Sequence, residues 1–311
     1  MRIAVMGSGG LGGFCGALLS RAGQDVTLIA RGPHLKAIQD GGLTIKSPVV
    51  GEFTVMPMAT DSPDSVGEVD LVVMGVKTYD VPAAIELVHP MVGKGTLLVS
   101  LQNGIEAAEQ IAAAFEADRV AVAISYINSL VESPGVIRHG SQHNELILGG
   151  LKAGRSAALD EAAAVLNEAS IDCDLREDIS IPRWEKFVLL AGTGGVMALT
   201  RLSLGPIRDC AETSALFQGV VSEACEVGRA AGVPLDENLV DHHWQLMQTY
   251  PASASSSMLF DIRAGRRLEL ESLNGAIVRL GAKLGVRTPL NFAVYAALKP
   301  YVDGEPVAAT D

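Results

Sequence analysis

The chain has 311 residues, of which 48% are hydrophobic and 19% charged, and its 36 acidic and 24 basic side chains give a net charge of −12. At about 100–200 residues per domain this length predicts two domains with sizeable cores, and the composition excludes a disordered or fibrous protein. The acidic balance argues against nucleic-acid binding, because phosphate backbones attract basic surfaces. Any anionic ligand must therefore be held by a local cluster of hydrogen-bond donors.

Short apolar runs alternate with helical stretches in the first half of the chain. The runs of strand length are Arg2–Met6, Asp25–Ala30, Asp70–Val76, Thr96–Leu101, Arg119–Ile124 and Glu145–Leu148. The helical stretches between them are Leu11–Ala22, Pro33–Gln39, Pro82–Val88 and Glu106–Phe115. Strands that alternate with helices predict a Rossmann-type, doubly wound and mostly parallel sheet. Leu43–Ile45 and Phe53–Val55 predict a small inserted hairpin.

Helical periodicity dominates after about residue 155, where strand-like runs almost vanish. The expected helices are Ala157–Glu168, Ile181–Leu199, Thr213–Ala230, Glu237–Met247, Glu269–Leu284 and Asn291–Leu298. We place a domain boundary near Arg176–Ser180, where a short charged segment precedes Pro182 at the start of a long helix. The sequence therefore predicts an α/β protein with a Rossmann-type domain over residues 1–177 and an all-helical domain over residues 178–311.

Cysteine usage and the start of the chain indicate the compartment. No CxxC pair occurs among the four cysteines, which are Cys15, Cys173, Cys210 and Cys225. Together with six scattered histidines this predicts a reducing compartment and no metal site. The first residues enter a strand pattern at once, without a signal segment, and the longest apolar run, Phe187–Leu199, is too short to span a bilayer. We expect a cytoplasmic protein that does not bind membranes.

Residues 2–12 contain a dinucleotide-binding fingerprint, G-x-G-x-x-G, between a strand and a helix. Its members are Gly7, Ser8, Gly9, Gly10, Leu11 and Gly12. Gly7 would allow a tight turn, Gly9 would let the backbone approach a pyrophosphate, and Gly12 would let the helix pack on the strand. Backbone N–H groups and the helix dipole then bind phosphates without any lysine. An ordinary glycine-rich turn is the alternative, which the flanking strand and helix disfavour.

The end of the second strand indicates which nucleotide binds. An NAD site usually carries Asp or Glu there, whereas this chain has Ala30-Arg31-Gly32. A planar cation suits a 2′-phosphate, so the sequence predicts NADP(H), with Arg31 as the main discriminator and a solvated arginine as the alternative. Lys77 and Asn103 follow two further strands, where ligands of open α/β sheets bind. A loop lysine and a helix N-cap asparagine are the alternatives for these two residues.

Three positions in the helical half are candidates for chemistry. Lys186 lies on a helix that is otherwise apolar for three turns, so desolvation would lower its pKa. Periodicity alone favours a lysine whose ammonium reaches water. Glu269 lies four residues before Leu273 on the buried stripe of the expected helix, where it either stabilises the helix start or faces a cleft. Ser257 precedes a short expected helix, and a serine N-cap is the alternative there.

Six motifs in chain order resemble the ketopantoate reductase family (2-dehydropantoate 2-reductases) from residue 2 to about residue 298. They are the fingerprint with Arg31, Val76-Lys77-Thr78, Leu101-Gln102-Asn103-Gly104-Ile105, Trp184-Glu185-Lys186, Ser256-Ser257-Met258-Leu259, and Glu269 with Asn274-Gly275. The resemblance implies NADPH-dependent reduction of a 2-oxo acid, 2-dehydropantoate or a close analogue, to the 2-hydroxy acid. It also implies a role for each candidate residue: Lys186 as general acid, Glu269 orienting the substrate hydroxyl, Ser257 binding the substrate carboxylate, and Asn103 and Lys77 beside the nicotinamide.

Three positions depart from the family pattern. Asparagines that the family carries four and eight residues after the lysine fall on Leu190 and Gly194, and one before the serine motif falls near Ala254. These asparagines line the pocket for the hydroxyls of pantoate, so a branched or hydrophobic 2-oxo acid is an alternative substrate. A catalytically silent NADPH-binding sensor and a related β-hydroxyacid dehydrogenase are the alternative functions, and the helical half is a candidate for homodimerisation.

Overall fold

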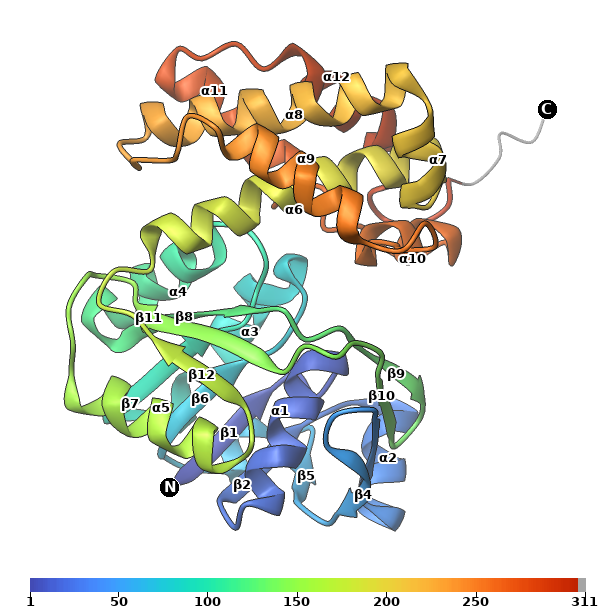
Figure 1. Cartoon of the computed structure of the whole chain (residues 1–311). Helices are drawn as coiled ribbons and strands as arrows, with labels where there is room; N and C mark the ends of the chain where they lie inside the picture. The colour runs from blue at the N-terminus through green and yellow to red at the C-terminus, as the bar shows by residue number, and fades with distance from the viewer. Residues whose placement is uncertain (307–311) are drawn as a thin grey trace. The chain divides into compact units, whose positions relative to one another are not determined.

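The computed structural model describes residues 1–306, which form two compact units (Figure 1). Unit 1 comprises Met1–Gln102 and Ala107–Ile179, and unit 2 comprises Asn103–Glu106 and the chain from Ser180 onward. Unit 1 contains a mostly parallel sheet with helices, and unit 2 is helical, so the expected fold class is confirmed. Within the described residues no helix is long and apolar enough to cross a membrane.

An eight-stranded sheet forms the centre of unit 1, in the order β12-β11-β8-β7-β6-β1-β2-β5. Its strands are β1 Arg2–Met6, β2 Asp25–Ile29, β5 Met58–Thr60, β6 Val69–Met74, β7 Val92–Ser100, β8 Val120–Ser125, β11 Glu145–Gly150 and β12 Asp172–Leu175. All neighbouring pairs are parallel except β8 with β11. The chain order reverses at β1, which lies between β6 and β2. The carboxyl ends of these three strands therefore share one edge, where open α/β sheets bind ligands.

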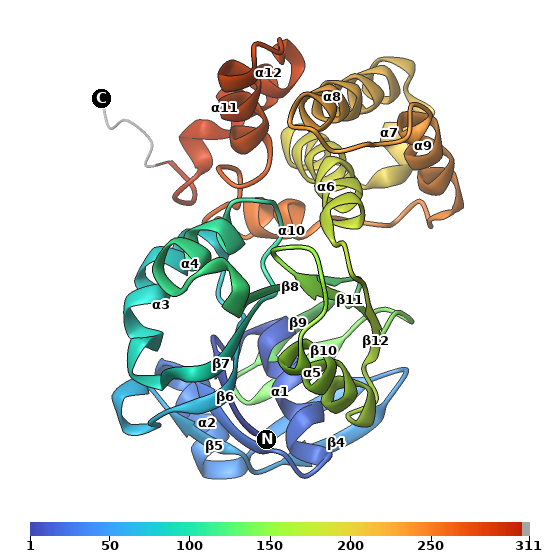
Figure 2. The ribbon, with the colours of Figure 1, turned by 90° about the vertical axis from the view of Figure 1, so that its left-hand side faces the viewer.

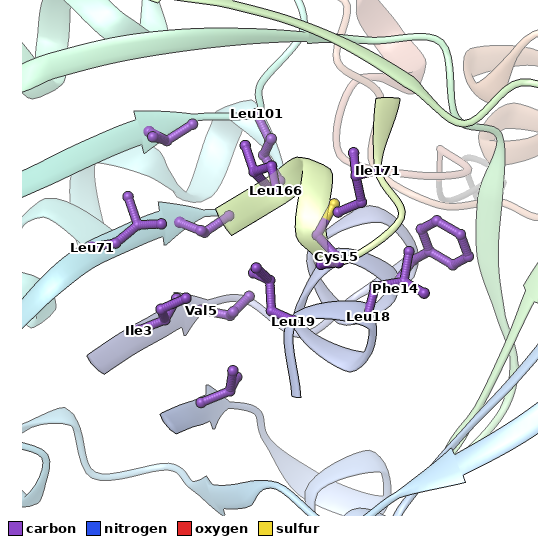
Figure 3. Packing of buried hydrophobic residues seen from close by; sticks show 14 of the residues in the cluster. Ile3, Val5, Phe14, Cys15, Leu18, Leu19, Leu71, Leu101, Leu166 and Ile171 are labelled. Carbon is purple, nitrogen blue, oxygen red and sulfur yellow. The ribbon is translucent and has the colours of Figure 1, made fainter. Parts of the chain in front are cut away.

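Helices cover both faces of this sheet because successive strand side chains point to opposite sides. Helices α1 (Gly10–Arg21) and α5 (Ala157–Glu168) pack on one face. Figure 3 shows this core, in which Val5 of β1 lies near Leu19 of α1, and Leu166 of α5 lies near Leu101. Helices α3 (Val81–Val88) and α4 (Ala107–Phe115) pack on the opposite face (Figure 2). Helix α2 (Gly32–Gly41) follows β2.

Helix α1 also packs against a second sheet, in the order β4-β3-β10-β9. Its strands are β3 Leu43–Ser47, β4 Gly51–Val55, β9 Ser129–Ser133 and β10 Val136–His139. Strands β3 and β4 form the expected hairpin, whereas β9 and β10 were not predicted. A Cβ atom at Gly13 would overlap the side chain of Ile137 in β10, and one at Gly16 would lie 2.6 Å from Leu28 in β2. The glycines of α1 are therefore required between two sheets, although glycine in a helix costs about 1 kcal/mol.

Seven α-helices form unit 2 within the described residues. They are α6 Ser180–Thr200, α7 Leu204–Asp209, α8 Ala211–Ala230, α9 Leu239–Thr249, α10 Ser257–Arg263, α11 Asn274–Leu284 and α12 Pro289–Leu298. Three glycines of α6 allow other segments to pack closely on it. A Cβ atom at Gly192 would lie 2.6 Å from Val221 of α8, and one at Gly194 would lie 3.1 Å from Met258 of α10. A Cβ atom at Gly195 would lie 2.6 Å from Asn274 of α11. Helix α6 is thus the common support of unit 2.

The helix expected over Glu269–Leu284 is wrong at its start. Residues 269–273 form turns, and α11 begins only at Asn274. The buried leucines of this segment are spaced by two and three residues, which is not a helical period: Leu268, Leu270 and Leu273. The backbone N–H of Leu268 also donates to the carbonyl of Val302, 2.9 Å away. Glu269 therefore lies in a turn held by core contacts and not on the stripe of α11.

A series of buried amides links the helices of unit 2. Asn274 donates to the carbonyl of Ala191 in α6 at 3.2 Å and to the side-chain oxygen of Asn291 in α12 at 3.0 Å. Asn291 in turn donates to the carboxylate of Glu223 in α8 at 2.9 Å. Glu223 also accepts from two backbone N–H groups in the first turn of α12, at 2.8 and 2.9 Å. This network fixes the start of α11, and with it one end of the turn that carries Glu269.

We expect Gly195→Ala to destabilise unit 2. The new Cβ atom would lie 2.6 Å from Oδ1 of Asn274, which is fully buried, so α6 and α11 would have to separate. The expected loss is about 1–3 kcal/mol, seen as a lower melting temperature by circular dichroism. Gly41→Ala is the control, because no described atom lies within 4 Å of its Cβ position. Equal melting temperatures of Gly195→Ala and the wild type would contradict this packing.

Candidate functional site

The three fingerprint glycines differ in their surroundings. Gly7 has a φ of +100°, and a Cβ atom there would lie 2.7 Å from Val76 beside β6. A Cβ atom at Gly12 would overlap the carbonyl oxygen of Gly7. At Gly9, by contrast, no described atom lies within 4 Å of the Cβ position. Gly7 thus makes the turn, Gly12 allows α1 to pack on β1, and the backbone at Gly9 is open to a ligand.

The loop is held by backbone contacts with the end of β2. The backbone N–H groups of Gly7 and Ser8 both donate to the carbonyl of Ile29, at 3.2 and 3.1 Å. The hydroxyl of Ser8 donates to the same oxygen at 3.1 Å. The ring of His34 in α2 lies 2.9 Å from the carbonyl oxygen of Ser8. Nothing in the local sequence pattern marks His34, three residues after Arg31, as a partner of this loop.

The start of α1 has the chemistry of an anion site. Gly9 is the N-cap residue, and the first turn of this 12-residue helix contains no acidic side chain. The first N–H groups of a helix lack partners within the helix and lie at the positive end of its dipole. One side of the loop is covered, since a Cβ atom at Gly10 would overlap the backbone of Ser129 in β9. These residues fit the pyrophosphate of a dinucleotide approaching at Gly9.

Two cationic side chains follow the strands on either side of β1. Arg31 is the exposed N-cap residue of α2 and follows β2 after Ala30, and its guanidinium forms no ion pair with residues 1–306. The first turn of α2 holds no carboxylate. Lys77 follows β6 and precedes the short 3-10 turn Thr78–Asp80. Because these parallel strands end at the same edge as β1, both residues follow the edge that carries the fingerprint.

Gln102 is a further residue at this edge whose role the sequence did not reveal. Its buried side-chain amide donates to the carbonyl of Met74 at 2.8 Å and to that of Val76 at 3.0 Å. Its side-chain oxygen accepts from the hydroxyl of Ser100 at 2.7 Å. Gln102 therefore holds the end of β6 in place immediately before Lys77. These partners lie 26 and 28 residues away along the chain, so no local spacing could have predicted them.

Lys186 of α6 and Glu269 interact electrostatically within unit 2. Burial lowers the pKa of Lys186 from 10.5 to about 8, and the carboxylate of Glu269 opposes this change by favouring the ammonium form. Glu269 itself is only 8% exposed. An ammonium with this pKa is still mostly protonated at neutral pH, yet it is a stronger acid than an ordinary lysine. Lys186 is half-buried on α6, and its pKa changes in the direction expected for a desolvated lysine.

The segment that contains Asn103 packs beside this pair. Gly104 has a φ of +88°, and a Cβ atom there would lie 2.6 Å from the carbonyl oxygen of Ser272. The hydroxyl of Ser272 donates to the carbonyl of Glu269 at 3.0 Å. The segment after Asn103 is thus in contact with the turn that carries Glu269.

The same segment is tied to the first turns of α6. The guanidinium of Arg183 donates to the carbonyl of Ile105 at 2.7 Å, and Arg183 lies three residues before Lys186. Helix α4 begins only at Ala107. The alternative that Asn103 is the N-cap residue of this helix is therefore wrong.

Ser257 is the first residue of α10 and is exposed. The N-cap of this helix is Ser256, whose hydroxyl accepts from the backbone N–H of Leu259 at 3.1 Å. The hydroxyl of Ser257 is thus not used for capping. Helix α10 packs on α6 at Gly194, two turns after Lys186. Within residues 1–306 no group of three or more His, Cys, Asp or Glu side chains could hold a metal ion.

Comparison with known proteins covers both units. The profile of the family described as ketopantoate reductase PanE/ApbA matches residues 3–152, and the profile of its C-terminal region matches residues 178–302. The uncharacterized oxidoreductase YkpB of Bacillus subtilis is 30% identical over 97% of this chain and 99% of its own length. The 2-dehydropantoate 2-reductase of Pyrococcus horikoshii is 29% identical over 96% of this chain and 97% of its own.

Solved structures give the same result. The PanE/ApbA family ketopantoate reductase from Ralstonia eutropha JMP134 has a TM-score of 0.90 at 31% identity, covering 97% of this chain and 98% of that one. The 2-dehydropantoate 2-reductase from Geobacter metallireducens GS-15 has a TM-score of 0.89 at 30% identity, covering 96% of this chain and 99% of that one. The chain therefore belongs to the ketopantoate reductase PanE/ApbA family of oxidoreductases, as the order of its sequence motifs predicted.

Proposed function

We propose that the protein catalyses the NADPH-dependent reduction of a 2-oxo acid, 2-dehydropantoate or a close analogue, to the 2-hydroxy acid. Family membership supports the class of reaction. The observation that carries the proposal is the pKa of Lys186, lowered by burial to about 8 beside the carboxylate of Glu269. In this proposal residues 1–177 form the NADP(H)-binding domain, and residues 178–311 form the substrate and catalytic domain.

NADPH supplies the hydride when it is bound. The backbone N–H groups at the start of α1, from Gly9 to Gly12, would bind its pyrophosphate, while those of Gly7 and Ser8 hold the loop on Ile29. Arg31 would bind its 2′-phosphate, for which a planar cation is the better partner. Lys77 and Asn103 bind toward the nicotinamide end. The open backbone at Gly9 and the absence of a carboxylate in the first turn of α2 support this arrangement.

Lys186 acts as the general acid in this mechanism. Reduction builds negative charge on the oxo oxygen of the substrate, and the ammonium of Lys186 stabilises that charge more in the transition state than in the ground state. The Nζ–H bond then breaks as the O–H bond of the product forms, which leaves Lys186 neutral until it takes up a proton from water. Glu269 favours the ammonium form before this step and orients the substrate hydroxyl. Ser257 binds the substrate carboxylate.

The surroundings of Lys186 bear on the side chain of the substrate. Leu190 follows Lys186 by one turn of α6, so its apolar side chain lies on the same side of the helix. A Cβ atom at Gly194, a further turn on, would lie 3.1 Å from Met258 and 3.4 Å from Leu273. Neither position supplies a side chain that can hydrogen-bond to a hydroxyl group. We therefore expect the protein to reduce branched apolar 2-oxo acids in addition to 2-dehydropantoate.

The proposal is tested by NADPH oxidation over a panel of 2-oxo acids that includes 2-dehydropantoate and branched apolar members. We expect turnover of at least one, and Lys186→Ala should lower kcat by at least about a hundredfold, the usual scale for a general acid, with NADPH binding intact. Lys186→Arg should be similarly slow, because a guanidinium keeps the charge but does not release a proton. Lys283→Ala in the last turn of α11 is the control. Inactivity on every 2-oxo acid, or full turnover by Lys186→Ala, would refute the proposal.

Arg31→Ala should weaken the binding of NADPH and not that of NADH. Loss of a charge-assisted contact with the 2′-phosphate predicts a Kd for NADPH about 10 to 100 times higher, with little change for NADH, which lacks this phosphate. Isothermal titration with both cofactors measures the ratio. Lys36→Ala is a matched control, because Lys36 is an exposed cation on the same helix whose ammonium pairs with Asp40. An unchanged ratio of the two affinities in Arg31→Ala would show that another residue selects the nucleotide.

The pH dependence of reduction should follow Lys186. The reaction requires the ammonium form, so kcat/KM for the 2-oxo acid at saturating NADPH should fall as the pH rises through about 8, where the pKa of Lys186 lies. Glu269→Gln removes the charge that favours the ammonium, so the midpoint should move to lower pH. Glu271→Gln, two residues away and paired with Arg279 and Lys299, should leave the midpoint in place. A midpoint that does not respond to Glu269→Gln would contradict the coupling.

A further inference from the structure

The ring of His34 connects two backbone groups that are far apart in the sequence. Its Nε2 atom lies 2.9 Å from the carbonyl oxygen of Ser8 in the fingerprint loop. Its Nδ1 atom accepts from the backbone N–H of Gly135, 3.1 Å away, in the turn between β9 and β10. Because Gly135 offers only a proton there and Ser8 only an oxygen, the ring must be the neutral tautomer with hydrogen on Nε2. The partial burial of the ring lowers the pKa of His34, which agrees with the neutral form.

This contact determines how the peptide group between Ser8 and Gly9 is oriented. In a planar trans peptide the C=O and N–H bonds point to opposite edges. A carbonyl of Ser8 that points to the His34 ring therefore directs the N–H of Gly9 away from α2. Gly9 is the N-cap residue of α1, and its Cβ position has no described atom within 4 Å. The N–H that a phosphate would use is thus directed away from the side of the loop on which His34 lies.

The second sheet supports the same arrangement. A Cβ atom at Gly135 would lie 3.0 Å from Ala37 of α2, so the β9–β10 turn packs directly on this helix. The carbonyl of Gly135 accepts from the N–H of Thr44 in β3 at 2.9 Å. Figure 1 shows β9 and β10 beside α2. His34 is therefore held from the side of the second sheet, and its orientation toward Ser8 does not depend on α2 alone.

We propose that His34 is a positioning residue for the pyrophosphate of the dinucleotide, acting by orienting the Ser8–Gly9 peptide so that the N–H of Gly9 can donate to a phosphate oxygen. The inference rests on the proposed binding of NADP(H). His34 does not touch the cofactor in this role. Its effect is limited to ligands that carry a pyrophosphate, which distinguishes it from Arg31, whose partner is the 2′-phosphate.

The test measures dissociation constants by isothermal titration with the full chain and three ligands. NADPH and 2′-phospho-ADP-ribose carry the pyrophosphate, whereas adenosine 2′-monophosphate does not. His34→Ala should raise the Kd of the first two by about tenfold, the scale of one lost hydrogen bond, and should change the third by less than about twofold. His34→Gln should restore NADPH binding to within about threefold of the wild type, because a side-chain amide can donate to Ser8 and accept from Gly135.

Gln39→Ala is the matched control. Gln39 lies on the same helix and donates to the carbonyl of Ala59 in β5 at 2.9 Å, so the variant loses a similar anchor of α2 without touching the fingerprint loop. Its three dissociation constants should equal those of the wild type. If His34→Ala does not fold, His34→Phe keeps the volume of the ring without its polar atoms and takes its place.

Three results would overturn the proposal. They are NADPH binding by His34→Ala equal to that of the wild type, His34→Gln as weak as His34→Ala, and a Kd for adenosine 2′-monophosphate that rises as much as that for NADPH. Failure of the wild-type chain to bind NADPH would instead refute the proposed function, on which this inference rests.

Discussion

The carbonyl oxygen of Gly7 lies where a side chain of Gly12 would begin, and a Cβ atom at Gly75 would lie 2.9 Å from the Cα atom of Gly12. The backbone of α1 therefore packs directly on the ends of β1 and β6. This contact brings the first N–H groups of α1 to the carboxyl edge of the sheet, where an anion can accept from them. A larger residue at Gly12 or Gly75 would push α1 away from β1 and β6. The packing of the second sheet on α1 and the hydrogen bonds of Ser8 therefore depend on this close contact.

Local electrostatics outweigh the net charge of −12 in this protein. The groups proposed to bind phosphate are backbone N–H groups and Arg31, which require no basic surface. In unit 2 the relevant effect is desolvation, which lowers the pKa of Lys186, while the buried carboxylate of Glu269 opposes it. A buried ammonium without such a partner would lose its proton more easily. The pair thus keeps an acid available at neutral pH in an apolar helix.

Sequence patterns predicted most of the helices and those strands of the large sheet that have buried faces. Hydrophobic alternation in strands and hydrophobic periodicity in helices are local properties of the sequence. They failed where burial is not periodic. Strand β9 is almost wholly exposed, and β5 has only three residues, so neither shows the alternation of a half-buried strand. The turn at Glu269 was mistaken for helix, because Leu273 continues the stripe of α11 while Leu268 and Leu270 are buried in a non-helical pattern.

The family, the order of the elements and the position of the fingerprint follow from residue identity and short spacings, so they could be predicted from the sequence. The groups that surround the candidate residues are set by the tertiary fold. His34 forms hydrogen bonds with Ser8 and Gly135, which are 26 and 101 residues away in the sequence. Gln102 forms one with Met74. The pKa of Lys186 was likewise decided by tertiary packing. Hydrogen-bond partners and desolvation depend on distances in space, which local sequence patterns do not encode.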